Sequence, residues 1–194
     1  MTIKETIDEA RTLMVPDVKT SDEKIFINIK NCLRLLYSNF DIKINEYLVE
    51  MSSLQTEYKL PDDTLKVLSC YAEPESNVVV QLALNNSSEI NSIFTPVYNI
   101  LQVPNPSDFS AIDVIYRAKH TELVFDNIET QELELPPMLY ECLYFYIAKN
   151  ISTSIDARKD YAYKFKEAYD FVVQSGTFDL VDIDVNNIAL KGYI

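Results

Sequence analysis

The fold of this chain is decided by residues 135–176, which read LPPMLYECLYFYIAKNISTSIDARKDYAYKFKEAYDFVVQSG. Proline has a fixed φ and no N–H, so Pro136 and Pro137 end an extended segment and suit the first turn of a helix. Apolar residues then recur four apart, at Leu139, Leu143, Ile147, Ile151 and Ile155. The spacing predicts a helix over 137–155 that is buried on most sides.

A second helix is predicted over 157–175. Ser154 or Asp156 can cap its start, because such side chains accept a hydrogen bond from the first helical turn. One face carries Tyr161, Phe165, Ala168 and Val172. Gly176 ends the helix, since glycine readily adopts the left-handed conformation found after helices. The two helices together predict a core helical hairpin.

The N-terminal part predicts two more helices, each opened by a capping box, in which glutamate follows threonine by three residues. Such pairs stand at Thr2 and Glu5, before a predicted helix over 3–14, and at Thr20 and Glu23, before a predicted helix over 21–39. The second of these helices has a wide apolar face made of Ile25, Ile29, Leu33 and Leu36. We expect it to be a core element.

A β region is predicted over 41–135, because the apolar period there changes to alternation. The strand signals fall at Ile42 and Ile44, at 54–60, 65–72 and 78–84, at Ile112 to Arg117, and at Leu123 to Phe125. Residues 93–106 are broken by three prolines, and the pattern assigns no element to them. The predicted fold class is α+β. A helical bundle with the core C-terminal hairpin and a small antiparallel β region form one domain over 1–176, followed by an extended tail over 177–194.

Composition narrows the functional classes. Seventeen basic and thirty acidic residues give a net charge of −13, which argues against binding a polyanion through its phosphates. No apolar run approaches the roughly 20 residues needed to span a bilayer, and the N-terminus lacks the apolar centre of a signal peptide. We therefore expect a cytosol-like compartment. Cys32, Cys70 and Cys142 are odd in number and stand in apolar stretches, which predicts buried reduced thiols.

No residue pattern predicts catalysis. The two glycines are too few for a glycine-rich phosphate loop. His120 is the only histidine and has no nucleophile motif beside it. The start of a calcium loop at 182–186 lacks both the turn glycine and the last glutamate, so a solvated acidic tail is the simpler interpretation. We expect no catalytic residue, no cofactor and no metal.

The C-terminal tail is the candidate binding segment. Its apolar residues are too numerous for a solvated terminus, and they follow a helix-ending glycine without a helical period. They are Phe178, Leu180, Val181, Ile183, Val185, Ile188, Leu190, Tyr193 and Ile194. Alternation with Asp182 and Asp184 suits an extended strand that joins a sheet edge or lies in a groove. The pattern predicts a partner surface.

Four short strings in this order resemble a known family. They are Thr20-Ser21-Asp22-Glu23, Tyr58-Lys59-Leu60-Pro61-Asp62-Asp63, Ile115-Tyr116-Arg117 and Glu134-Leu135-Pro136. The chain is similar over residues 20–176 to the head-to-tail connector proteins of tailed bacteriophages, the adaptors of the tail tubular protein A type. It departs from them in lacking glycine-containing loops and in the segment 93–106.

The resemblance implies a structural protein of the virion neck that is present in the host cytoplasm during assembly. It implies a twelve-subunit ring beneath the portal protein, with the helices near the portal and the β region facing a downstream tail or nozzle protein. DNA would pass through the lumen without specific binding, and the tail over 177–194 would bind the portal. Two alternatives stay open: an acidic monomeric cytosolic binding module, and an enzyme with an unrecognised site.

Overall fold

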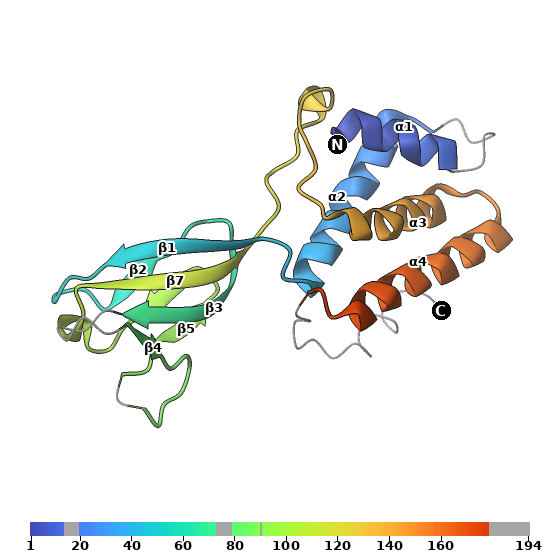
Figure 1. The fold of residues 1–194 in the computed structure, drawn as a ribbon. Helices are drawn as coiled ribbons and strands as arrows, with labels where there is room; N and C mark the ends of the chain where they lie inside the picture. The colour runs from blue at the N-terminus through green and yellow to red at the C-terminus, as the bar shows by residue number, and fades with distance from the viewer. Residues whose placement is uncertain (14–19, 73–78, 90, 179–194) are drawn as a thin grey trace. The chain divides into compact units, whose positions relative to one another are not determined.

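The structure, a computed structural model, describes residues 1–13, 20–72, 79–89 and 91–178. It is a mixed α+β fold of helices and antiparallel sheets (Figure 1). Contacts gather the chain into two compact units, Met1–Ile42 with His120–Ile194 and Lys43–Lys119. The first is the helical unit and the second is the β unit. The β unit is inserted between the second and third α-helices of the helical unit.

The helical unit holds four α-helices and two short 3-10 turns within the described residues. The α-helices are α1 (Ile3–Leu13), α2 (Asp22–Asn39), α3 (Tyr140–Ile151) and α4 (Ile155–Ser175), and the turns are Phe125–Asn127 and Pro137–Leu139. α3 contacts each of the other three helices and lies between α1 and α4 (Figure 1). Leu143 and Ile147 of α3 are fully buried, and so is Leu139 of the turn before it. The apolar period at four-residue spacing therefore builds the core of this unit.

The helix starts test the predicted capping boxes. At α1 the capping box is confirmed by two reciprocal hydrogen bonds. Thr2 N–H donates to Glu5 Oε2 at 2.8 Å, and Glu5 N–H donates to Thr2 Oγ1 at 3.1 Å. At α2 the prediction of Thr20 as cap is wrong. Ser21 is the cap, and its Oγ accepts from Lys24 N–H at 3.4 Å. Ser21 has the extended backbone that a cap needs, while Thr20 offers its carbonyl to Arg11.

The predicted helix over 137–155 is divided in the structure. It begins as the 3-10 turn and ends at Ile151, because Ser152 adopts an extended backbone. Ser154 then caps α4, accepting from Ala157 N–H at 3.5 Å, so Ile155 opens the next helix. α4 ends where predicted, with Gly176 in the left-handed region at φ 62°.

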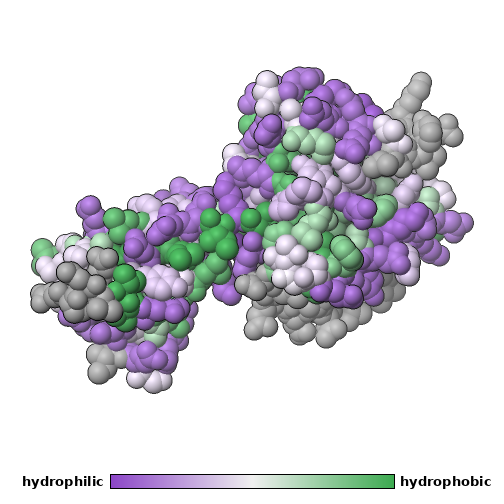
Figure 2. Space-filling view, in the orientation of Figure 1, coloured by the Kyte–Doolittle hydropathy of each residue, from purple (hydrophilic) through white to green (hydrophobic). Residues whose placement is uncertain are grey.

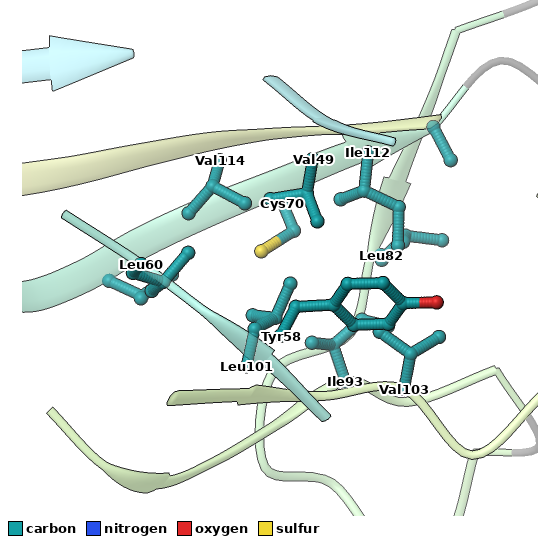
Figure 3. Close-up of a cluster of buried hydrophobic side chains, with 12 residues drawn as sticks. Val49, Tyr58, Leu60, Cys70, Leu82, Ile93, Leu101, Val103, Ile112 and Val114 are labelled. Carbon is teal, nitrogen blue, oxygen red and sulfur yellow. The ribbon is translucent and has the colours of Figure 1, made fainter. Parts of the chain in front are cut away.

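The β unit is built from two antiparallel sheets. The first has the order β1 (Ile44–Glu50), β7 (Ala111–Ala118), β3 (Thr64–Ala72) and β4 (Val80–Leu82); the second has the order β2 (Glu57–Lys59), β6 (Ile100–Gln102) and β5 (Phe94–Val97). Apolar side chains from both sheets meet in one core, shown in Figure 3, with Val49, Cys70 and Val114 from the first sheet and Tyr58 and Leu101 from the second. Alternation is clearest in β7, where Ile112, Val114 and Tyr116 are buried and the residues between them are partly exposed.

One segment of the β region has no assignment from the sequence, and one prediction in this region is wrong. Residues 93–106, which the prolines leave unassigned, contain the strands β5 and β6. Pro96 is tolerated because β5 is an edge strand, on which a missing N–H costs no ladder bond. Leu123 to Phe125 form no strand: Phe125 begins a 3-10 turn, and Phe26 packs against its ring at 5.3 Å.

Candidate interaction surfaces

The residues predicted to bind the portal fall mostly outside the described part of the chain. Phe178 is described, and its ring lies 5.8 Å from that of Phe40 at the end of α2. The other eight lie outside the described residues: Leu180, Val181, Ile183, Val185, Ile188, Leu190, Tyr193 and Ile194. The first apolar residue of the tail therefore anchors to its own helical unit.

His120 is held in a network of hydrogen bonds within the helical unit. Glu134 N–H donates to its Nε2 at 3.2 Å, and its Nδ1 lies against the carbonyl of Thr121. The neutral ring with the proton on Nδ1 satisfies both contacts. The ring edge also meets Tyr37 at 5.3 Å, and Tyr37 donates its hydroxyl to the Glu134 carbonyl. This geometry gives His120 a structural role between two backbone segments.

The three cysteines are buried and free, as the sequence predicts. Burial raises the pKa of the Cys70 thiol to about 12 and acts the same way on Cys32 and Cys142. In the ranges that the structure describes, no group of three or more His, Cys, Asp or Glu side chains is arranged to hold a metal ion. None of the helices described is long and apolar enough to cross a membrane.

The helix α4 presents a largely unburied surface. It has 21 residues, of which only Ala168 and Val172 are buried. Its inner side meets α3 through the rings of Tyr146 and Phe165, 5.8 Å apart. Large side chains on the other sides stand out of the unit: Ile155 is 69% exposed, Tyr163 62% and Phe171 67%. These exposed apolar groups make α4 a candidate surface for a partner.

A concave groove lies between α1 and α3. Its volume is about 470 Å³, and it is lined by Met1, Glu9, Leu133, Leu135, Pro137, Tyr140 and Tyr144. We call this the α1–α3 groove. The two tyrosine rings lie 6.0 Å apart, and the Tyr144 hydroxyl donates to Glu9 Oε2 at 2.5 Å. The groove therefore has two aromatic rings and the carboxylate of Glu9 next to one another in its lining.

The groove is surrounded by negative charge. Burial raises the pKa of Tyr140, and the nearby charges of Glu9, Glu132 and Glu5 raise it further. Burial also raises the pKa of Tyr144, together with its hydrogen bond to Glu9. Burial is the larger cause of both shifts, and the nearby carboxylates add to them because each opposes a second negative charge on the phenols. Carboxylates therefore lie near the aromatic side chains of the groove.

The β unit has an exposed strand of its own. β1 lies at the edge of the four-stranded sheet, where Ile44 and Leu48 are 54% and 55% exposed. An edge strand with exposed apolar side chains can accept a further strand or another protein surface. Hydrophobic residues stand among hydrophilic ones on the surface seen in Figure 2.

Sequence reasoning missed both the exposed α4 face and the α1–α3 groove. The exposed side of α4 could have been suspected from the sequence, because Ile155 and Tyr163 stand eight residues apart on the predicted helices. The groove joins residues 1–9 to residues 133–144, which no local pattern connects. Comparison of the chain with models of known protein families and with curated protein sequences found no match.

Proposed function

We propose that this protein is a structural head-to-tail adaptor of a tailed bacteriophage, which forms a ring beneath the portal and joins it to a downstream tail or nozzle protein. The observation that carries the proposal is the exposed face of α4, together with the resemblance of the sequence strings to the connector family. A partner surface would bury the apolar area that Ile155, Tyr163 and Phe171 expose. A structural assembly supplies such a surface permanently.

The resembling strings stand at structural boundaries. Thr20 to Glu23 opens α2, and Tyr58 to Asp63 leads from β2 into β3. Glu134 to Pro136 enters the turn before α3. These strings therefore lie at the starts and ends of elements, in the order of elements that the resemblance implies.

The two units suit two partners. In the proposed ring, α3 and α4 form the hairpin core of the portal-side layer, and the exposed edge strand β1 belongs to the side that meets the tail component. The net charge of −13 per subunit repels packaged DNA, which lets DNA slide through the lumen without adhering. The protein acts in the virion neck after assembly in the host cytoplasm.

The C-terminal tail is the proposed portal-binding arm. Phe178 anchors the start of the tail at Phe40, and the apolar residues from Leu180 to Ile194 continue beyond it. A strand added to a sheet edge gains main-chain hydrogen bonds, while alternate side chains enter pockets. The tail would order against the portal in this way.

Co-purification with the portal protein of the same genome tests the proposal. Full-length protein should bind the portal, while deletion of residues 179–194 should leave a folded protein that does not bind. This deletion keeps Phe178 on Phe40, so it separates binding from stability; deletion of 177–194 removes that contact as well. Failure of the full-length chain to bind the portal, or normal binding by the 179–194 deletion, would contradict the proposal.

A further inference from the structure

The outer side of α4 carries two positive charges in line with its exposed apolar groups. Ile155, Lys159, Tyr163 and Lys166 follow one another at spacings of four, four and three residues, which places them on one face of a helix. We call these four residues the α4 stripe. Within the described part of the chain, Lys159 and Lys166 are exposed and form no ion pair, whereas Lys164 pairs with Asp160 at 2.9 Å.

The α1–α3 groove offers the matching chemistry. Leu133 and Leu135 line it with apolar side chains, and Tyr140 and Tyr144 line it with aromatic rings. Glu9 lines it, and Glu5 and Glu132 flank Thr2 nearby, Glu5 through the capping hydrogen bond and Glu132 through a β-bridge. All three glutamates are exposed. A groove with apolar and aromatic lining and carboxylates nearby is complementary to an apolar stripe that carries lysines.

We propose that the α4 stripe of one copy of this chain docks in the α1–α3 groove of a second copy. The inference rests on the proposed function, because it names the surfaces through which subunits of the ring would meet. α3 lies between α1 and α4 in the helical unit, so stripe and groove are different patches of one molecule (Figure 1). Contact between two different patches is head-to-tail, and repetition of it closes a ring when the rotation allows.

The contact combines three favourable terms. Ile155 and Tyr163 lose exposed apolar area against the leucines and tyrosines of the groove. Lys159 and Lys166 meet carboxylates, and an ammonium group beside the tyrosine faces gains a cation–π interaction. Lysine charges on the stripe also offset the self-repulsion of an acidic chain at this contact. A copy with its stripe facing another stripe would gain none of the charge pairing.

Disulfide trapping between two single variants tests the contact. E9C places a thiol in the groove and K159C places one on the stripe; both positions are exposed, so both variants should fold. The native cysteines are buried and give little background. At millimolar concentration under mild oxidation, the mixture of E9C and K159C should form a covalent dimer, and each variant alone should not. K24C, at an exposed lysine of α2, replaces K159C as the matched control.

Charge reversal tests the pairing itself. Adding K166E to the K159C variant should lower the trapped yield severalfold, and adding E132K to the E9C variant should recover it. A mixture that traps no more dimer than the K24C control, or a yield that K166E leaves unchanged or E132K does not recover, overturns the contact. A closed ring with the portal but without these cross-links would overturn this contact alone. Cross-links in an open polymer that never closes on the portal would support the contact and contradict the proposed function.

Discussion

Glu134 donates its backbone N–H to Nε2 of His120 at 3.2 Å, which joins the segment before α3 to the segment that follows β7. The same Glu134 accepts the hydroxyl of Tyr37 on its carbonyl and the hydroxyl of Thr121 on its side chain at 2.8 Å. The single histidine of the chain thus connects two backbone segments, since both of its ring nitrogens have backbone partners.

Replacement of His120 with alanine should lower the free energy of unfolding by about 1 kcal/mol, because the exposed hydrogen bonds of its ring to Glu134 N–H and to the Thr121 carbonyl are lost. Assembly with the portal should be unchanged. Chemical denaturation measures the first and co-purification the second. If a folded H120A variant failed to assemble, the structural role assigned to His120 would be wrong and a functional role would have to be considered.

Replacement of Leu143 or Ile147 with aspartate should prevent folding. Both side chains are fully buried in α3, and an unpaired carboxylate there would cost more than a domain of this kind can lose. The matched control is Tyr163→Asp on the exposed side of α4, which should fold. Circular dichroism and thermal melting separate the two outcomes, and a cooperative melt of L143D would contradict the assigned core.

The pH dependence of stability should have a contribution from Asp22. Burial alone would raise the pKa of this carboxyl, but hydrogen bonds and charges from Lys4 and Arg11 outweigh burial and hold the pKa below its usual 3.8. A folded-state pKa below the unfolded value adds stability at pH above about 4, and this stability is lost as the pH falls through the folded pKa.

Asp22→Asn should therefore destabilise the protein by about 0.5–1 kcal/mol at pH 7, the range for a partly exposed ion pair. The difference from the unsubstituted protein should shrink as the pH falls below 3.8. Glu23→Gln, in the same first turn of α2, is the control for a general charge effect. Urea denaturation at several pH values measures both variants, and a D22N effect that stays constant down to pH 2 would contradict the ion-pair assignment.

Much of the helical unit could be predicted from the sequence because its signals are local. The reciprocal bonds of Thr2 and Glu5 and the left-handed Gly176 depend only on neighbouring residues. The break at Ser152 was missed because the four-residue apolar period continues across it to Ile155, which the structure leaves exposed. Period alone does not distinguish one long helix from two helices in register.

The strands β5 and β6 and the α1–α3 groove depend on distant partners. Pro96 argues against a strand in the sequence, and it becomes compatible with one only when that strand is known to lie at a sheet edge. Glu9 and Tyr144 meet across 135 residues of sequence, through the packing of α1 on α3. No local pattern predicts such a meeting, so the sequence indicated a candidate surface in the tail and missed the candidate surfaces on the helices.

The mass of the native assembly tests the central claim most directly. The protein alone should be a monomer or a weak associate at micromolar concentration, because a net charge of −13 makes subunits repel. Mixed with the portal protein of the same genome, it should form a complex whose native mass corresponds to about twelve copies per portal ring. A stable closed oligomer without any partner, or a monomer that the portal leaves unchanged, would contradict the account.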